Sequence, residues 1–408
     1  MSHVWSWLFW GSVGTVAYTY LVYPALLFLF HLVAGGWDDL EYLIRRKKRR
    51  VSDQEGFSPD RLPHVSFVTA AHNEEGVLTK KIENTLGLDY PSDRMELLIG
   101  SDASGDRTVE IVRQSSDSRV RVFDYTERSG KIGVLKKLVP EAKGEILVFS
   151  DANTFFENDS LKKLIRHFCD PEVGVVCGEL RLTASDGTLQ NEGAYWRFET
   201  ILKMLESRFG AVLGANGGIY AVRRKLFPEI PGDTIIEDFV IPLLIRGKGY
   251  RTSFDPEAVA LERNPVDPRG EFRRRVRIGT GCAQAMPLIR HLLSPRFGML
   301  AFSLWSHKVV RWAVPFTLLL AMGANLALLS EAGRCPCHPY VVTLSLQILF
   351  YALAVMGWLR NRWNKPLWIF GLPFLFVAMN AALLTGFLRF WLGLHQVAWK
   401  PTARTVDG

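Results

Sequence analysis

Cysteine is scarce in this chain of 408 residues, and the spacing of its five cysteines excludes the usual structural metal sites. The two nearest cysteines, Cys335 and Cys337, are separated by one proline and have no second pair beside them. Structural zinc sites need pairs spaced by about two to four residues, usually in two sets. We therefore expect reduced, buried thiols at Cys169, Cys177 and Cys282, as is usual for a domain in the cytosol.

No lysine or arginine precedes the first long apolar stretch, which runs from Val4 to Val33. A secretory signal would begin with basic residues, followed by a shorter apolar core and a small-residue cleavage site. We therefore expect a membrane span, which needs about 20 apolar residues. The basic run Arg45–Arg50 follows this stretch, so the positive-inside rule predicts an outer N-terminus and a cytosolic central region.

The formal net charge of +8 does not indicate nucleic-acid binding, because much of the excess lies in the run Arg45–Arg50. A basic run beside an apolar helix sets the orientation of that helix and meets anionic lipid headgroups. We expect the lipid bilayer as a partner and no nucleic acid.

Three later segments are also apolar and long enough to span a bilayer: Val309–Ser330, Pro339–Leu359 and Leu367–Leu388. The basic residues between the last two segments predict a cytosolic loop. The segment Met286–His307 mixes apolar and basic residues. It is predicted to be an amphipathic helix pair in the cytosolic interface, or else a surface helix of the soluble region.

These features predict a multi-pass protein of the plasma (bacterial inner) membrane with its catalytic domain in the cytosol. We expect four parts: an N-terminal transmembrane helix with a basic stop-transfer segment at 1–50, a cytosolic domain at 51–284, amphipathic interfacial helices at 285–308, and about three transmembrane helices at 309–408.

Strand-like and helical runs alternate between Val65 and about Ala260, and no internal repeat or low-complexity tract is evident. The predicted strands are Val65–Ala70, Met95–Ser101, Arg119–Phe123, Ile146–Ser150 and Val173–Val176. The predicted helices are Gly76–Leu86, Asp106–Ser115, Lys131–Val139 and Ser160–Phe168. Such alternation predicts an α/β domain with a mostly parallel sheet covered by helices.

Aspartates follow two of the predicted strands, at Asp102 and Asp151. A single aspartate in a turn is usually only a cap, but carboxylates at neighbouring strand ends converge on one crevice. Asp151 and Asn153 are two residues apart, so their side chains point the same way in an extended segment. Carboxylate and amide oxygens suit a divalent cation that would neutralise a bound diphosphate.

Glu237 and Asp238 precede an apolar run and are predicted to begin a helix. They are either a helix cap with a first-turn acid or a catalytic pair. The segment Asn216–Tyr220 is either a close approach of backbone to a ligand or a plain turn. The cluster Arg273–Arg277 would bind phosphates or lipid headgroups.

The order of these motifs resembles inverting family-two glycosyltransferases. The motifs are Ala71-His72-Asn73-Glu74-Glu75, Ser101-Asp102-Ala103-Ser104, Ser129-Gly130-Lys131 and Asp151-Ala152-Asn153. Ile236-Glu237-Asp238 looks like the (T)ED motif of that family, and Arg274–Ile278 looks like its QxxRW motif. The membrane flanks narrow the resemblance to synthases of the hyaluronan, cellulose and poly-N-acetylglucosamine type.

The resemblance implies a GT-A-type, Rossmann-like fold and a nucleotide-diphospho-sugar donor, most often a UDP-sugar. It implies donor contacts from Ala71, His72, Asn73, Glu74, Asp102, Lys131, Asp151, Arg275 and Arg277. Asp151 and Asn153 take the DxD positions that would hold Mg²⁺ or Mn²⁺.

The resemblance also assigns catalysis and the acceptor side. Inverting transfer needs one base for the acceptor hydroxyl, and Asp238 takes that role with Glu237 orienting it. The residues expected near the acceptor are Asn216, Gly217 and Gly218, with Trp196 or Tyr195 as a stacking surface for a sugar ring. Core packing is the other reading of those two aromatic side chains.

The chain departs from the family pattern at three positions. Asn153 replaces the second aspartate of the DxD motif, which predicts weaker metal binding. Arg274 and Ile278 replace the glutamine and tryptophan of QxxRW, which leaves the acceptor and processivity open.

Three functions follow from these observations. The first is a transferase that extends a growing polysaccharide, with a second copy or an export partner because four spans are few for a channel. The second is a transferase that adds a single sugar to a lipid-linked acceptor at the cytosolic membrane face. The third is a non-catalytic membrane receptor for a nucleotide or nucleotide-sugar, against which the intact Glu237-Asp238 pair argues.

Overall fold

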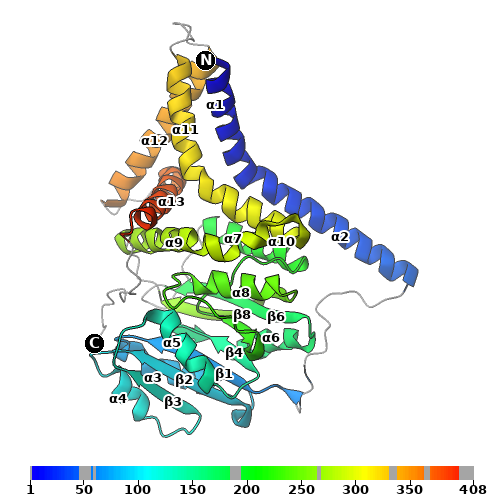
Figure 1. Cartoon of the computed structure of the whole chain (residues 1–408), viewed down its shortest axis with the longest axis vertical. Helices are drawn as coiled ribbons and strands as arrows, with labels where there is room; N and C mark the ends of the chain where they lie inside the picture. The colour runs from blue at the N-terminus through cyan, green and yellow to red at the C-terminus, as the bar shows by residue number, and fades with distance from the viewer. Residues whose placement is uncertain are drawn as a thin grey trace. The chain divides into compact units, whose positions relative to one another are not determined.

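A computed structural model describes residues 2–45, 57, 61–183, 194–263, 268–329, 338–362 and 368–394 (Figure 1). Most of the basic run Arg45–Arg50, together with Cys335 and Cys337, lies outside these described residues. The chain divides into two compact units. The helical unit comprises Met1–Leu26, Asp267–Gln284 and Leu304–His395, and the α/β unit comprises Leu27–Val266, Ala285–Ser303 and Gln396–Gly408.

The α/β unit is built on a mixed sheet whose eight described strands have the order β3-β2-β1-β4-β7-β6-β8-β5. The strands are β1 (Val65–Ala71), β2 (Met95–Asp102), β3 (Val120–Tyr125), β4 (Ile146–Phe149), β5 (Thr154–Phe156), β6 (Val173–Thr183), β7 (Tyr220–Arg223) and β8 (Arg251–Arg263). Strands β3, β2, β1 and β4 run parallel to one another, and so do β6 and β8. Strand β7 is antiparallel to β4 and β6, and β5 is antiparallel to β8.

The α/β fold class and the five predicted strands are confirmed, and the sheet is mixed because of strands that were not predicted. Strands β5 and β7 are only three and four residues long, so they carry too little pattern to be recognised. Strand β8 includes Arg251, Asp255 and Glu257 among its residues, which hides its strand character. The two short strands supply all the antiparallel pairings of the sheet.

The predicted helices between strands are present as α3 (Glu75–Leu86), α4 (Thr108–Arg113), α5 (Gly130–Leu138) and α6 (Ser160–Arg166). Two further helices, α7 (Ala194–Arg208) and α8 (Glu237–Gly247), complete the set in this unit before its last strand. Helix α5 packs on β1 and β2, and α6 packs on β6, β7 and β8. The parallel strands are therefore covered by helices, as buried parallel strands require.

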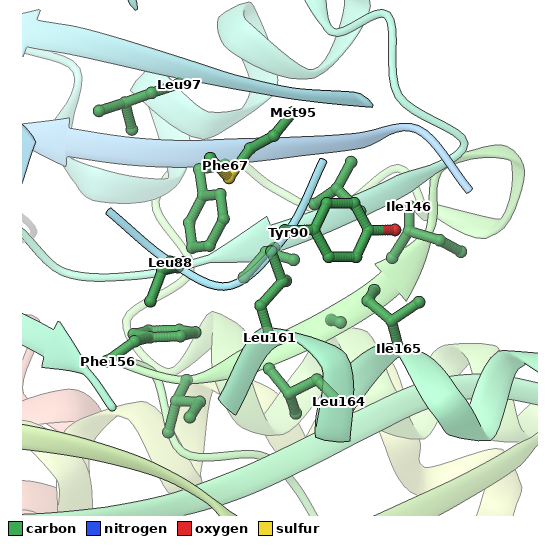
Figure 2. Packing of buried hydrophobic residues seen from close by; sticks show 14 of the residues in the cluster. Phe67, Leu88, Tyr90, Met95, Leu97, Ile146, Phe156, Leu161, Leu164 and Ile165 are labelled. Atoms are coloured by element: carbon green, nitrogen blue, oxygen red, sulfur yellow. The ribbon is translucent and has the colours of Figure 1, made fainter. Parts of the chain in front are cut away.

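One face of the sheet packs on α3 and α6 to form a large hydrophobic core (Figure 2). Phe67 of β1 meets Phe156 of β5 edge-on, with 5.5 Å between the ring centroids. Leu161, Leu164 and Ile165 of α6 fill the space beneath these rings. Every residue of β1 is buried, which explains its continuous apolar and small-residue sequence.

The remaining α-helices of the described residues differ in length and composition. They are α1 (Ser2–Ala17), α2 (Tyr23–Arg45), α9 (Pro268–Ile289), α10 (Met299–Ser303), α11 (Val310–Leu329), α12 (Pro339–Arg362) and α13 (Trp368–Trp391). Among the described residues, four stretches are long and apolar enough to cross a membrane: His3–Gly35, Met299–Leu329, Pro339–Arg360 and Phe370–Trp391. These stretches overlap the four spans predicted from the sequence.

The segment Met286–His307, predicted to form a pair of interfacial helices, is joined to the helices on either side of it. Helix α9 extends to Ile289, and α10 continues through a π-helical turn at Leu304–Val309 into α11. The apolar stretch therefore begins at Met299, inside the predicted interfacial segment. The placement of this segment at a membrane surface stays a prediction.

Within the helical unit, α9 and α13 approach closely at small residues. A Cβ atom added at Gly386 would lie 2.5 Å from the Val276 carbonyl oxygen, and one at Gly279 would lie 3.0 Å from Leu383. The Thr280 hydroxyl donates to the Val276 and Gly386 carbonyl oxygens, at 3.1 Å each. Glycine and threonine at such contacts allow helices in lipid to pack backbone to backbone.

We expect Gly144→Ala to destabilise the α/β unit. A Cβ atom there would lie 2.5 Å from the Ser66 backbone nitrogen and 2.7 Å from the Val65 carbonyl carbon, so β1 itself would have to move. Overpacking of this kind costs about 1–3 kcal/mol. Thermal unfolding of the full chain in detergent should show a lower midpoint.

The control is Gly76→Ala in α3, where a Cβ meets nothing within 4 Å and alanine favours the helix. Equal midpoints for Gly144→Ala and the wild type would contradict this packing.

Candidate active site

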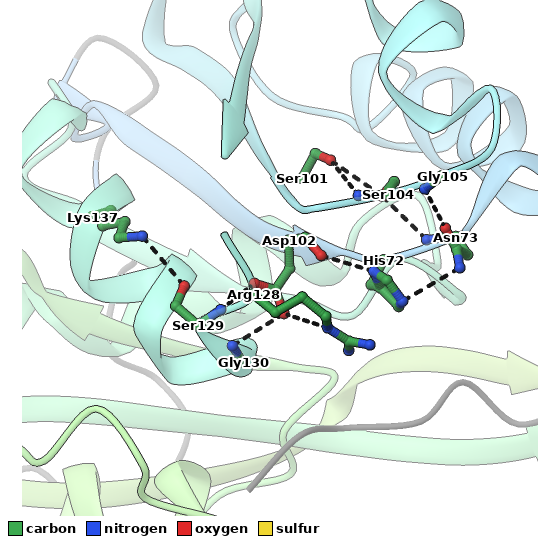
Figure 3. Close-up of polar contacts among 10 residues, drawn as sticks. All are labelled: His72, Asn73, Ser101, Asp102, Ser104, Gly105, Arg128, Ser129, Gly130 and Lys137. Atoms are coloured by element: carbon green, nitrogen blue, oxygen red, sulfur yellow. Dashed lines mark hydrogen bonds and ion pairs between the residues drawn. The ribbon is translucent and has the colours of Figure 1, made fainter. Parts of the chain in front are cut away.

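The loops that follow β1 and β2 are joined to each other at the carboxyl edge of the sheet (Figure 3). A ring nitrogen of His72, Nδ1, lies 2.8 Å from the carbonyl oxygen of Asp102. The Gly105 backbone N–H donates to the Asn73 side-chain oxygen at 2.8 Å. Asn73 and Ala103 both have left-handed backbone, with φ of 54° and 53°. Such conformations are uncommon outside glycine and concentrate at functional sites.

Most of the first motif is buried, with Asn73 and Glu75 exposed. Ala71 is the last residue of β1 and has no exposed surface. Glu74 is 3% exposed, and its backbone N–H donates to the Thr108 hydroxyl at 2.8 Å. This motif therefore fixes the shape of the loop, and its predicted contacts with a base or ribose stay a prediction.

The Asp102 carboxylate is 1% exposed and accepts hydrogen bonds from the start of α5. The backbone N–H groups of Ser129 and Gly130 donate to its two oxygens, at 2.6 and 3.0 Å. Arg128 Nε lies 3.7 Å from the same carboxylate. A carboxylate at a helix N-terminus is favoured because it satisfies free N–H groups and faces the positive end of the helix dipole. Asp102 therefore fastens β2 to the turn that carries Lys131.

The Lys131 ammonium lies between carboxylates that come from different parts of the sequence. Its Nζ atom is 2.7 Å from Asp151 Oδ1 and 2.7 Å from Glu237 Oε1. Burial alone would lower the pKa of Lys131, but Asp151, Glu237 and Asp238 outweigh it and hold that pKa well above its ordinary value. Residues from three sequence motifs, those of Lys131, Asp151 and Glu237-Asp238, thus lie around one ammonium group that stays charged.

The acidity of Asp238 is altered by its surroundings. Burial, with the nearby Glu237 carboxylate adding to it, raises the pKa of Asp238 to about 6, against the opposing Lys131 charge. Glu237 is 5% exposed and forms the ion pair with Lys131 from the first turn of α8. A carboxyl group with a pKa near the working pH is suited to accept and return a proton. Asp238 therefore has the properties of a general base, and Glu237 those of its orienting neighbour.

The glycines before β7 let the backbone pass beside these acids. A Cβ atom at Gly217 would lie 3.0 Å from Asp238 Oδ2 and 3.4 Å from Lys131 Nζ. One at Gly218 would lie 2.7 Å from the Thr154 hydroxyl. The backbone therefore approaches the acidic cluster itself, and a contact of these glycines with a sugar acceptor stays a prediction.

Asn216 is held by protein groups at both ends of its amide. Lys203 Nζ donates to its oxygen at 2.5 Å, and its nitrogen donates to the Gly178 carbonyl at 2.7 Å. The Ala215 backbone N–H donates to the Asp238 carbonyl at 2.8 Å, which ties this loop to α8. Asn216 thus supports the glycine turn, and its contact with an acceptor stays a prediction.

The DxD positions offer oxygen ligands but no complete metal cage. Asp151 is paired with Lys131, and the Asn153 side-chain N–H donates to Glu262 Oε1 at 3.1 Å. Across the described ranges, no group of three or more His, Cys, Asp and Glu side chains could hold a metal ion. Carboxylate and amide oxygens fit Mg²⁺ or Mn²⁺, which take few protein ligands and complete their shell with water and substrate phosphates. The site therefore fits a cation that arrives with a diphosphate.

Four predicted residues lie outside the described side chains or in the helical unit. The side chain of Trp196 lies outside the described residues, as does that of Tyr195. Arg275 and Arg277 belong to α9 in the helical unit, where Arg275 Nε pairs with Glu271 at 2.7 Å. Their contact with a donor diphosphate stays a prediction.

The structure also adds residues that sequence reasoning missed. Tyr220 follows the glycine turn, stacks on Phe149 with 4.8 Å between ring centroids, and is fully buried. Burial, then the Glu237 carboxylate, raises the pKa of Tyr220 well above its ordinary value. Its hydroxyl has no hydrogen-bond partner among the described atoms. Lys203 and Lys81 are also missed, although a lysine on the apolar face of a helix was a usable signal at Lys81.

Comparisons with known proteins agree with this geometry. Residues 66–230 match the model of the family described as Glycosyl transferase family 2. Poly-beta-1,6-N-acetyl-D-glucosamine synthase of Staphylococcus aureus (strain MSSA476) is 24% identical over 268 residues, and the probable glycosyltransferase YdaM of Bacillus subtilis (strain 168) is 26% identical over 280 residues. Each match covers 64% of this chain and 64% of the relative's length.

A solved structure shares the fold over most of the chain. The mannosyltransferase PcManGT from Pyrobaculum calidifontis, in complex with GDP-Man and Mn²⁺, aligns with a TM-score of 0.65 and 23% identity. The alignment covers 91% of this chain and 99% of that one. The family match lies on the unit that holds the Lys131 cluster, and the predicted GT-A-type fold is confirmed. The chain therefore carries a glycosyl transferase family 2 domain.

Proposed function

We propose that this protein is an inverting membrane glycosyltransferase that moves a sugar from a UDP-sugar to a growing polysaccharide, with Asp238 as the base. The observation that carries the proposal is the cluster of Asp151, Glu237 and Asp238 around the Lys131 ammonium. It combines a carboxyl group with a pKa of about 6 and a fixed positive charge beside the DxD position. Inverting transfer from a sugar diphosphate needs both features.

The proposed step requires one proton acceptor. An acceptor hydroxyl attacks the anomeric carbon from the face opposite the diphosphate, and its proton passes to an Asp238 carboxylate oxygen. The bond from the anomeric carbon to the diphosphate oxygen breaks, and the nucleoside diphosphate leaves with the electron pair. Burial, with the Glu237 carboxylate adding to it, keeps the Asp238 pKa high enough to take the proton, and Glu237 itself pairs with Lys131.

The leaving diphosphate needs positive charge, and two sources support the proposal. Mg²⁺ or Mn²⁺, held by Asp151 and Asn153 when bound, would supply Lewis-acid charge to the diphosphate. Lys131 contributes a charge that is present at every working pH. The remaining proposed donor contacts are Ala71, His72, Asn73, Glu74, Asp102, Arg275 and Arg277.

The proposed acceptor is a polysaccharide, and the proposed setting is a membrane. The name of the poly-N-acetylglucosamine synthase relative supports a polysaccharide acceptor. The four apolar helices support a multi-pass protein of the plasma (bacterial inner) membrane, with the catalytic unit on the cytosolic side. A second copy or an export partner would assist passage of a polymer.

Donor and product are tested by incubating the full chain in nanodiscs with radiolabelled UDP-sugars, or GDP-mannose, and Mn²⁺. We expect transfer from a UDP-sugar into a high-mass product that sizes as a ladder. A single-sugar product that partitions into organic solvent would replace the polysaccharide with a lipid-linked acceptor. Transfer from GDP-mannose alone would overturn the UDP assignment. Nucleotide binding without transfer would favour a receptor.

We expect Asp238→Asn to reduce kcat by about 10²- to 10⁴-fold, because it removes the proton acceptor. The wild-type rate should rise with pH through about 6, the pKa of Asp238. Asp233→Asn, an exposed change of the same chemistry nearby, should keep the wild-type rate and profile. A variant at Asp238 that retains transfer with an unchanged pH profile would remove it from the base role.

The same substitution has an expected effect on stability. The folded-state pKa of Asp238 lies above its ordinary value of 3.8, so the folded protein binds this proton more tightly than the unfolded chain does. The carboxyl group therefore contributes stability at pH below about 4, and this contribution is lost as the pH rises through about 6. Asp238→Asn should raise the thermal midpoint more at pH 7.5 than at pH 4.5, as measured by scanning fluorimetry.

Asn153→Asp tests the altered DxD motif. A second carboxylate would strengthen Mn²⁺ binding and lower the Mn²⁺ concentration that half-activates transfer, by roughly tenfold. Without metal it would place a carboxylate about 3 Å from Glu262, where the amide now donates at 3.1 Å, and so lower the thermal midpoint. Asn158→Asp, at an exposed position, is the control. An unchanged Mn²⁺ requirement in Asn153→Asp would show that this position does not contact the metal.

A further inference from the structure

Lys81 is a fully buried charged side chain that the proposed mechanism does not use. It lies on α3, has no exposed surface, and points toward the loop between β4 and β5. A fully buried ammonium is costly unless its N–H groups find hydrogen-bond acceptors. The hydrogen-bond partners of Lys81 therefore indicate its role.

Both partners of Lys81 belong to the turn that carries the DxD positions. Nζ donates to the Ser150 hydroxyl at 2.6 Å and to the Thr154 carbonyl at 2.7 Å. Ser150 and Thr154 are the residues that immediately flank Asp151–Asn153 in the sequence. One ammonium thus joins the two ends of the turn from beneath, and the Thr154 backbone N–H closes the turn onto the Asp151 carbonyl at 3.1 Å.

The same helix holds the turn at a second point. The Asn84 side chain donates to the Phe156 carbonyl at 2.8 Å and accepts from the Phe156 backbone N–H at 2.8 Å. Residues three apart lie on one face of a helix, so Lys81 and Asn84 act from the same side of α3. The Lys81 ammonium also lies 5.3 Å from the centre of the Phe156 ring. The turn is therefore fastened to α3 through side chains at both of its ends.

We propose that Lys81 is a positioning residue that sets the geometry of the Asp151–Asn153 turn, and thereby the affinity of the enzyme for the metal–diphosphate part of the donor. This inference rests on the proposed function. Lys81 contacts neither Asp151 nor Asn153 through any hydrogen bond of the described structure, so it acts through the turn. Burial lowers the pKa of Lys81 to about 7, against the opposing charge of Asp151, which agrees with its tight enclosure.

Lys81→Met tests the proposal, because methionine nearly matches the volume of lysine and removes the donors that hold the turn. In ligand-free protein, hydrogen exchange of the peptide spanning residues 150–156 should become faster. The dissociation constant for UDP with Mn²⁺, measured by calorimetry, should rise by about 10- to 100-fold, the usual effect of losing such support. The KM for the acceptor should not change. Lys80→Met, one residue earlier and exposed, is the matched control and should behave as the wild type.

Ser150→Ala removes one of the two contacts without touching the lysine, and should shift exchange and binding in the same direction by less. If Lys81→Met fails to fold, Ser150→Ala tests the proposal in its place. A general loss of structure would lower the active fraction without raising the dissociation constant of the molecules that remain folded.

The outcomes separate the inference from the proposed function. Unchanged exchange and unchanged UDP binding in Lys81→Met would overturn the positioning role, whether or not the wild type transfers sugar. If the wild type binds UDP with Mn²⁺ but transfers nothing, the proposed function fails while the comparison of exchange and binding still decides the role of Lys81. If the wild type binds no nucleotide, both the proposed function and the donor-affinity role are overturned.

Discussion

The site depends on the placement of one ammonium group among three carboxylates. Asp151, Glu237 and Asp238 come from the end of β4 and the start of α8, and their mutual repulsion would separate them without Lys131. Lys131 in turn is placed by the first turn of α5, which the buried Asp102 carboxylate caps. Polar contacts therefore connect Asp102 at the end of β2, through Lys131 in α5, to Glu237 and the proposed base in α8. Each of these residues lies in a strand or helix.

Two acids that are neighbours in the sequence have different environments in this cluster. Glu237 is paired directly with Lys131, whereas Asp238 is buried beside Glu237 and has a raised pKa. The difference arises because the start of α8 directs the Glu237 side chain at the ammonium group. A buried carboxyl group with a raised pKa beside a second acid is typical of sites that move a proton.

Much of the domain could be predicted from the sequence because the signals are local. Strands β1, β2 and β4 are largely apolar runs, and the motifs at Asp102, Asp151 and Asp238 lie at or near the ends of regular elements. The parts that were not predicted depend on partners far away in the chain. Strands β5 and β7 are short and are specified mainly by pairing, and Tyr220 stacks on Phe149 only because β7 lies beside β4. The sequence predicted Asp102 as a ligand contact, whereas identifying the helix that it caps required the positions of Ser129 and Gly130.

The buried face of helix α3 both packs in the hydrophobic core and holds the turn between β4 and β5. Leu78 and Ile82 fill the hydrophobic core, and Lys81 and Asn84 hold the β4–β5 turn. A tilt or slide of the helix that relieves a packing defect would also carry the two polar anchors with it. Precise packing of this core therefore matters for the shape of the turn as well as for stability. On the proposed role of Lys81, substitutions deep in the apolar layer would alter donor affinity before they unfold the protein.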